Sequence, residues 1–229
     1  MTRANKENPD AGLTASERIL NASEMLFAQR GYAGASMRDI ARAAGAPVSL
    51  ITHHFGTKEE LFRHVIERRI HEQTNVTLDD IARARAESGG GPVSLEALIR
   101  CYMEPMFIKS IHGGAGWKNY AKLMGLAMFN SQYDDFLKPM IDVYDRVQST
   151  FAEECRKIFP LADERRLQLA IFFLNSSILS ALVESGMLDR QSDGLCRSSD
   201  LRVIVDEMIP FYAAAFRQRL SVPVSAPEA

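Results

Sequence analysis

Adjacent acidic residues, two adjacent histidines and three cysteines are the side chains that could act in catalysis or bind a metal. Paired carboxylates can serve as general acid and base, but each acidic pair here lies in a polar helical stretch or at a helix start. His53 and His54 would point about 100° apart on a helix, so they would not hold one ion together. The cysteines are too widely spaced for a zinc site. We therefore expect no enzyme, no cofactor and no bound metal. The acidic pairs are Glu59–Glu60, Asp79–Asp80, Asp134–Asp135 and Glu153–Glu154.

Two helix starts and one short helical face could bind DNA instead. Ser36 and Lys58 lie at predicted helix N-termini, where free backbone amides and the helix dipole favour a phosphate. In the short helix predicted over Pro47–Phe55, Ile51 and Phe55 are one turn apart and should face the core. The opposite face mixes polar and small apolar side chains, and the major groove is wide enough to admit such a helix. The residues of this outer face are Pro47, Val48, Ser49, Thr52 and His53.

These residues lie in the segment Thr14–Phe62, in which three helices should begin. Each start has a hydroxyl residue followed three places later by an acid, the pattern of a capping box. Gly31 and Gly45 stand where helices should end, because Gly adopts the left-handed conformation that closes a helix. The second and third helices, joined by Gly45-Ala46, form a predicted helix-turn-helix. The pattern predicts a helix ending near Arg30, helices over Ser36–Ala44 and Pro47–Phe55, and a fourth helix from Thr57.

The string from Ser36 to Leu61 resembles the N-terminal domain of TetR-family transcriptional regulators. The matching residues are Arg38, Ile40-Ala41, Ala44-Gly45, His54-Phe55, Gly56-Thr57-Lys58-Glu59 and Leu61, and the spacing from Gly45 to Phe55 to Lys58 agrees without a gap. The resemblance implies a homodimer, a palindromic DNA operator and a C-terminal ligand or signal domain. It also implies DNA contacts by Ser36, Met37, Pro47, Val48, Ser49, Thr52, His53, His54 and Lys58.

Net charge gives the DNA interpretation no added support. The formal net charge is −2, and residues 1–62 contain seven Lys and Arg against seven Asp and Glu. Phosphate contacts come mostly from Lys and Arg, so any attraction to DNA must come from where the charges lie. The family commonly has a phosphate-binding Tyr where this chain has Thr52 or His53. The neutral segment and the missing Tyr favour an alternative, a helical protein-interaction module that has lost DNA binding.

The remainder of the chain predicts a larger helical domain. We expect an all-α chain of about nine helices, in which the Gly-rich stretch 112–116 is a loop rather than a phosphate cradle. The expected parts are a flexible arm (1–13), a three-helix helix-turn-helix domain (14–67), a ligand-binding and dimerisation domain (68–220) and a tail (221–229). Beyond the fourth helix, which should run to Ala86, we expect helices over 94–111, 117–128, 134–159, 163–185 and 201–220.

The larger domain should contain an apolar pocket and a dimer interface. Methionines and a lone Trp in a helical domain can line a site for a small apolar or amphipathic effector. Asn175 lies inside an apolar helix and needs a partner, either a ligand or its counterpart across a twofold axis. Helices 163–185 and 201–220 are apolar on nearly every side, which favours a four-helix interface with a second copy. The candidate ligand-binding residues are Phe107, Trp117, Tyr120, Met124, Met128, Phe172 and Asn175.

The composition favours a cytoplasmic protein without a membrane partner. The 229 residues are 46% hydrophobic and 24% charged, which is ordinary for a soluble domain. The longest apolar run, 167–183, is interrupted by Gln168, Asn175 and three serines, and we expect it not to span a membrane. An odd number of scattered cysteines suits a reducing compartment. The predicted helix-turn-helix, the family resemblance and the larger helical domain together imply a dimeric, ligand-responsive regulator of transcription, most often a repressor.

Overall fold

The computed structural model describes residues 12–128 and 134–221, and the side chains of 127–140 lie outside this description. Ten helices and no strand occupy the described residues, which confirms the all-α prediction with one short helix more than expected. The chain divides into two compact units, Met1–Arg68 and Arg69–Ala229. Almost all of the predicted arm, 1–13, and of the predicted tail, 221–229, lies outside the described residues.

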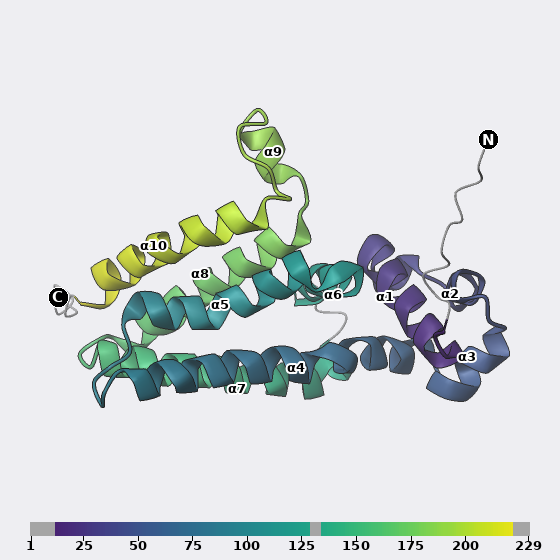
Figure 1. The fold of residues 1–229 in the computed structure, drawn as a ribbon, viewed down its shortest axis with the longest axis horizontal. Coiled ribbons are helices and arrows are strands. Elements are labelled where there is room, and N and C mark those ends of the chain that lie inside the picture. The colour runs from purple at the N-terminus through teal and green to yellow at the C-terminus, as the bar shows by residue number, and fades with distance from the viewer. Residues whose placement is uncertain (1–11, 129–133, 222–229) are drawn as a thin grey trace, which may run out of the picture. The chain divides into compact units, whose positions relative to one another are not determined.

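The first unit contains the three short helices that the sequence predicts. They are α1 (Ala15–Gly34), α2 (Met37–Ala44) and α3 (Val48–Phe55), followed by the first turns of α4 (Lys58–Glu87) (Figure 1). α1 is interrupted at Gly31, whose φ of +70° is open to glycine but costly for other residues. Gly45 closes α2 in the left-handed conformation, with a φ of +59°. Both glycines thus end helical runs where the sequence places them.

Capping boxes begin three of these helices, as predicted. At α1 the amide of Thr14 donates to Glu17 over 2.8 Å, and the amide of Glu17 donates back to the Thr14 hydroxyl over 3.2 Å. Ser36 with Asp39 forms the same reciprocal pair at α2. At the start of α4 the amide of Thr57 donates to Glu60 over 2.7 Å. These bonds satisfy amides that the first helical turn leaves without partners.

A small aliphatic and aromatic core holds the first unit together. α1 contacts both α2 and α3, and the side chains between them are shielded from solvent. The Arg18 guanidinium donates to the carbonyl of Ala44 over 3.3 Å, which ties α1 to the C-terminal end of α2. The largest fully buried side chains of this core are Ile19, Phe27, Ile40, Ile51, Leu61, Phe62 and Ile66.

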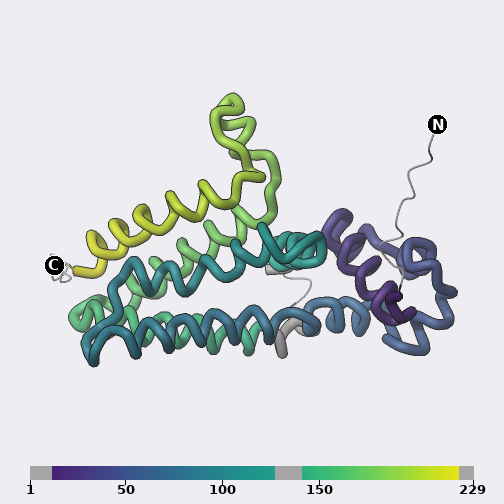
Figure 2. The backbone as a smooth tube through the Cα atoms, in the orientation of Figure 1, coloured from purple at the N-terminus to yellow at the C-terminus, as the bar shows by residue number. Residues whose placement is uncertain are grey.

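The second unit is a helical bundle around α5. α5 contacts α6, α7, α8 and α10, and α6 also contacts α8. α9 and its flanking turns project from the connection between α8 and α10, as the backbone trace shows (Figure 2). The helices of this unit, after the continuation of α4, are α5 (Leu95–His112), α6 (Gly114–Met128), α7 (Asp134–Ile158), α8 (Glu164–Val183), α9 (Met187–Gln191) and α10 (Leu201–Leu220).

Two boundaries and one additional helix in the second unit differ from the prediction. The loop expected over 112–116 is shorter, because α6 already begins at Gly114. α8 ends at Val183, and its C-cap Glu184 adopts a left-handed φ of +50° two residues before the predicted stop at Gly186. The helix α9 was not predicted, since five residues between Gly- and Ser-rich turns are too few to show a helical period.

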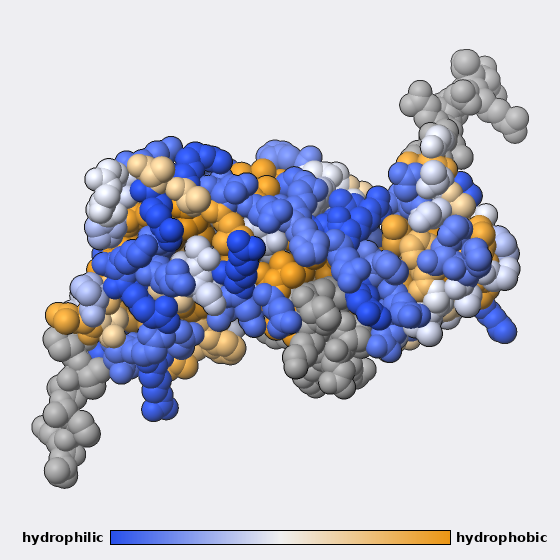
Figure 3. Space-filling model, turned by 90° about the horizontal axis from the view of Figure 1, so that it is seen from below, coloured by the Kyte–Doolittle hydropathy of each residue, from blue (hydrophilic) through white to orange (hydrophobic). Residues whose placement is uncertain are grey.

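α8 is more apolar on its surface than the sequence analysis allowed. By length and composition alone this helix could cross a membrane, and only 22% of its most apolar window is buried within the chain. The expectation that the run is too polar for such a span is therefore wrong as far as its composition is concerned. On the face drawn in Figure 3, by contrast, hydrophilic side chains interrupt the hydrophobic areas.

α6 and α8 approach each other closely at Gly125, and a substitution there tests this contact. A Cβ atom at this buried position would lie 2.7 Å from Val183 Cγ2 and 2.8 Å from the Leu179 carbonyl oxygen. We expect Gly125→Ala to lower the free energy of unfolding by about 1–3 kcal/mol, because the backbone oxygen cannot rotate away. Gly91→Ala is the control, since its Cβ would meet nothing closer than 3.6 Å. Equal urea midpoints for the two variants would contradict this reading of the contact.

Candidate DNA interface and ligand cavity

The outer face of α3 is open to solvent along its whole length. Ile51 and Phe55 are buried, so they fix α3 to the first unit and turn the opposite side outward. The face offers one apolar side chain, hydroxyls and imidazoles, the groups that can contact a thymine methyl or the polar edge of a base. The Thr52 hydroxyl donates to the Val48 carbonyl over 3.1 Å but keeps its lone pairs as acceptors. The exposed residues are Pro47, Val48, Ser49, Thr52, His53 and His54.

The polar groups of Ser36 are already hydrogen-bonded within its own helix. Its amide and its hydroxyl both donate to the Asp39 carboxylate, over 3.3 and 2.5 Å. The hydrogen bonds with Ser36 also hold the pKa of Asp39 below its ordinary value. A phosphate at this helix start would therefore meet the other amides of the first turn, beside the half-buried Met37, rather than the free donors that the sequence analysis expected.

Lys58 is positioned by an aromatic cluster. Its ammonium lies 4.3 Å from the centroid of the Tyr32 ring, and Tyr32 packs against Phe27 and Phe62. Partial burial lowers the pKa of Lys58. The three N–H donors of an ammonium can bind a phosphate while the ring stabilises the charge from one side. The cluster thus holds the cation at the start of α4 in one place.

Two arginines of α2 add positive charge that the sequence analysis did not assign. Arg38 and Arg42 are both exposed and one helical turn apart. Arg42 forms an ion pair with Asp39 over 3.3 Å. Arg38 forms no hydrogen bond or ion pair within the described part of the chain, so it is available to a phosphate. The available signal was the i, i+4 spacing of two arginines on a short helix whose other face is apolar.

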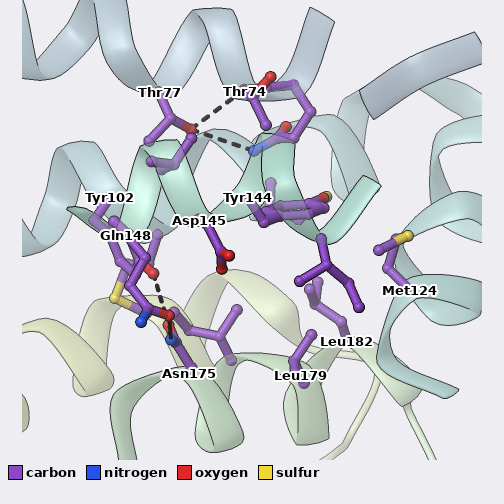
Figure 4. Close-up of a pocket in the computed structure, with 16 residues that line it drawn as sticks. Thr74, Thr77, Tyr102, Met124, Tyr144, Asp145, Gln148, Asn175, Leu179 and Leu182 are labelled. Atoms are coloured by element: carbon purple, nitrogen blue, oxygen red, sulfur yellow. Dashed lines mark hydrogen bonds between the residues drawn. The ribbon is translucent and has the colours of Figure 1, made fainter. Parts of the chain in front are cut away.

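The second unit contains a cavity between α4, α5, α6, α7 and α8. It encloses about 840 Å³ of empty space, its open mouth included. Figure 4 shows its polar and apolar walls, with Tyr102, Gln148 and Asn175 grouped on one side and Met124 and Leu182 on the other.

The predicted ligand-binding residues occupy three different environments. Met124 and Asn175 line the cavity. Phe107, Trp117 and Tyr120 are buried and do not belong to its lining. Phe172 is 61% exposed on α8 and is also not among the lining residues. The side chain of Met128 lies outside the described residues.

Asn175 finds its partners inside the chain, which differs from both expectations for it. The Tyr102 hydroxyl donates to Asn175 Oδ1 over 2.8 Å, and Asn175 Nδ2 donates to Gln148 Oε1 over 3.0 Å. These bonds join α5, α8 and α7. Burial raises the pKa of the Tyr102 phenol, which therefore keeps its proton and remains the donor. Neither a ligand nor a second copy is needed to satisfy this amide.

Trp117 lies between two cations rather than in the cavity wall. The Arg69 guanidinium and the Lys109 ammonium lie 4.9 and 4.7 Å from its ring. Lys109 also pairs with Glu72 of α4. The indole therefore joins α6 to α4 and α5 through electrostatic contacts with its π-system.

Several cavity residues were missed because they are polar. Gln73, Thr74 and Thr77 line the cavity from α4, where the buried stripe through Ile70 and Ile81 would ordinarily be aliphatic. A polar interruption of an apolar stripe was the signal that could have identified them. Tyr144, Asp145 and Gln148 lie in a mixed stretch of α7 that gives no such signal.

Comparisons with known proteins establish the family. Residues 100–215 match the model of the tetracyclin repressor-like C-terminal domain, and residues 19–65 match that of bacterial regulatory proteins of the tetR family. The chain belongs to the TetR family of DNA-binding transcriptional regulators. This class is not enzymatic.

Particular relatives share the N-terminal segment. Over 53 residues the chain is 40% identical to the HTH-type transcriptional repressor AcnR of Corynebacterium efficiens, a match covering 23% of this chain and 28% of that protein. Over 51 residues it is 47% identical to the HTH-type transcriptional regulatory protein RaaS of Mycobacterium tuberculosis, covering 22% and 24% of the two chains. These matches span about a quarter of the relatives' own length.

Solved structures share the fold over most of the chain. AmtR of Mycobacterium smegmatis aligns with a TM-score of 0.58 at 20% identity, over 96% of this chain and 100% of that one. FadR from Bacillus subtilis, in complex with stearoyl-CoA, aligns with a TM-score of 0.61 at 14% identity, over 86% and 97%. At these identities the likeness concerns the fold alone.

The capping boxes predict a dependence of first-unit stability on pH. The fold lowers the pKa values of Glu17, Asp39 and Glu60 through their cap hydrogen bonds. Carboxylates of this kind stabilise the fold above their unfolded pKa, and the stabilisation is lost as the pH falls through the folded pKa. Thermal melts should therefore shift to lower temperature between pH 6 and pH 3.

Asp39→Asn isolates one of these contributions. The variant should melt at a lower temperature than the wild type at pH 6 and lose less on acidification, because the titrating carboxylate is gone. Glu59→Gln is the matched control, since Glu59 forms no capping hydrogen bond among the described residues. Parallel pH profiles for wild type and Asp39→Asn would contradict the assignment.

Proposed function

We propose that this chain is a cytoplasmic, homodimeric transcriptional repressor that reads a palindromic operator and releases it when a small molecule fills the second unit. The observation that carries the proposal is the exposed outer face of α3, on a helix-turn-helix whose inner face is fully anchored. A relative named as a transcriptional repressor supports repression rather than activation.

The contacts with DNA divide into positioning and reading. Lys58 and Arg38 bind phosphates, and the amides at the starts of α2 and α4 assist them. Val48, Ser49, Thr52 and His53 meet base edges in the major groove, where each base pair shows a distinct pattern of donors and acceptors. Pro47 and His54 flank this set, and Ser36 and Met37 lie at the start of α2.

A second copy of the chain covers the apolar surface of α8 and α10. Large hydrophobic side chains of these two helices are exposed in the single chain, which is unfavourable in water. The run is long enough for a membrane span, but a twofold four-helix interface buries it equally well and belongs to a soluble regulator. A twofold axis also supplies two reading helices for two half-sites. The exposed residues are Leu169, Phe172 and Phe173 on α8 and Val203 and Phe211 on α10.

The cavity supports a response to a ligand. α4 is one continuous helix from Lys58 to Glu87, and Gln73, Thr74 and Thr77 of this helix line the cavity. A ligand that binds one arrangement of α4 more tightly shifts the protein towards that arrangement, and by no more than its difference in affinity. That a fold neighbour was solved with stearoyl-CoA supports ligand binding by this architecture.

Substitutions in the first unit should separate positioning from reading. Lys58→Ala removes a phosphate contact and should weaken binding to any DNA fragment, with a smaller dependence on salt. His53→Ala should cost about 1–3 kcal/mol on the operator and little on unrelated DNA. Fluorescence anisotropy with a fragment of the chain's own promoter and a scrambled fragment measures both effects.

Arg197→Ala is the control for these variants, because it removes an exposed cation of the second unit. It should leave both affinities unchanged. A wild-type chain that binds the promoter fragment no better than the scrambled one at low salt would sink the proposal and favour the interaction module instead.

The dimer interface can be tested by placing charges on it. Phe172→Glu combined with Phe211→Glu should give monomers of 25.6 kDa, whereas the wild type should have twice that mass. Each Phe loses about 1.5–3 kcal/mol of burial, and each added carboxylate would be desolvated. Leu161→Glu is the control, because Leu161 is 82% exposed outside both helices. Light scattering after size exclusion measures the masses, and a monomeric wild type would refute the interface.

A further inference from the structure

The described lining of the ligand cavity carries a negative charge and no positive one. Asp145 is the one charged side chain in its described lining, which contains no Lys, Arg or His. Figure 4 shows the Asp145 carboxylate pointing into the space between α7 and α8. Within the described part of the chain Asp145 forms no hydrogen bond and no ion pair. It is exposed to solvent, which places it at the open side of the cavity.

A second unused acceptor lies in the buried wall. Gln73 is 4% exposed, and its Oε1 atom is buried without a hydrogen-bond partner. Its Nε2 atom donates to the Thr77 hydroxyl over 3.4 Å, so the amide is held in this orientation. A buried acceptor without a partner is unfavourable, and a ligand that brings a donor would relieve the cost.

The other polar groups of the wall already bind one another. The Tyr102, Asn175 and Gln148 side chains form a linear chain of two hydrogen bonds, which uses the Asn175 oxygen and the Gln148 oxygen as acceptors. Tyr144 shares a hydrogen bond of 3.1 Å with Tyr120 outside the cavity, and burial raises its pKa to about 12, so the phenol remains neutral. The groups left for a ligand are neutral amide groups, such as Gln73 Oε1 and Gln148 Nε2, and one charged group, the Asp145 carboxylate.

The rest of the wall is apolar and adaptable. Met103, Met106 and Met124 line it together with Ile178, Leu179 and Leu182. Methionine side chains adjust to irregular apolar shapes, so this wall specifies little beyond hydrophobicity. The chemistry of recognition thus falls on Asp145 and Gln73.

We propose that the cavity selects amphiphilic cations, molecules with an apolar body and a protonated amine that binds Asp145. This inference rests on the proposed ligand response and names the class of effector. A further N–H or O–H of the same molecule satisfies Gln73 Oε1. Anionic amphiphiles are disfavoured, because their charge would approach Asp145 and find no cation in the described lining.

Three probes of equal length test the charge selectivity. Decylamine, decan-1-ol and decanoate share one alkyl chain and differ in head-group charge at pH 7. Calorimetric titration of the full-length protein, below the micellar concentrations of decylamine and decanoate and the solubility limit of decan-1-ol, should give the tightest binding for decylamine. We expect about tenfold weaker binding of decan-1-ol, the size expected for one charge-assisted hydrogen bond, and still weaker binding of decanoate.

Two variants of α7 locate the effect. Asp145→Asn should weaken decylamine binding about tenfold and leave decan-1-ol binding unchanged. Asp142→Asn removes a charge one turn away that does not line the cavity, and it should change neither. Gln73→Met, which removes the buried acceptor, should weaken decylamine and decan-1-ol alike, since both carry donors. Circular dichroism confirms that each variant is folded.

Equal or tighter binding of decanoate, the absence of binding by all three probes, or an equal effect of Asp145→Asn and Asp142→Asn would overturn the inference. The proposed repressor is tested separately, by operator binding without any probe. If decylamine binds through Asp145 while the protein fails to recognise its promoter, the charge selectivity stands and the regulator fails. If operator binding is intact and decanoate is preferred, the reverse holds.

Discussion

An eight-residue helix is not stable by itself in water, and the first unit depends on two such helices. α2 is capped by Ser36 at its start, and both α2 and α3 persist because one face of each enters a shared core. Ile40, Ile51 and Phe55 are buried in this core, so the side chains on the opposite face of α3 are not needed to hold the fold. A surface released in this way can vary in sequence without loss of the fold, which is the requirement for reading different DNA sites on one scaffold.

Most of this first unit could be predicted from the sequence, because its determinants are local. The capping pairs at Thr14, Ser36 and Thr57 and the breaks at Gly31 and Gly45 are set by residues within four positions of one another. The function of the individual side chains was harder to predict. That both donors of Ser36 are used by Asp39 depends on a side-chain rotamer, which no spacing rule specifies.

In the second unit the helices could be predicted from the sequence, but the cavity between them could not. Helix positions in α5, α7 and α10 followed from apolar periodicity, but the cavity depends on which helices meet. The aromatic residues expected to line it became ordinary core, as Phe107 and Tyr120 did. Its distinctive groups are Gln73 and Asp145, polar residues on helices far apart in the sequence. Phe172 looked like a pocket residue because the sequence cannot tell an inward apolar face from an outward one.

The approach of α6 to α8 at Gly125 has a mechanical consequence. The Leu179 carbonyl and the Val183 side chain lie so close to Gly125 that no side chain fits between α6 and α8 at this point. We therefore expect α6 and α8 to keep their relative position when the cavity is filled. A displacement that accompanies filling is then carried by α4 and α7, whose backbones approach their neighbours less closely than α6 approaches α5 and α8.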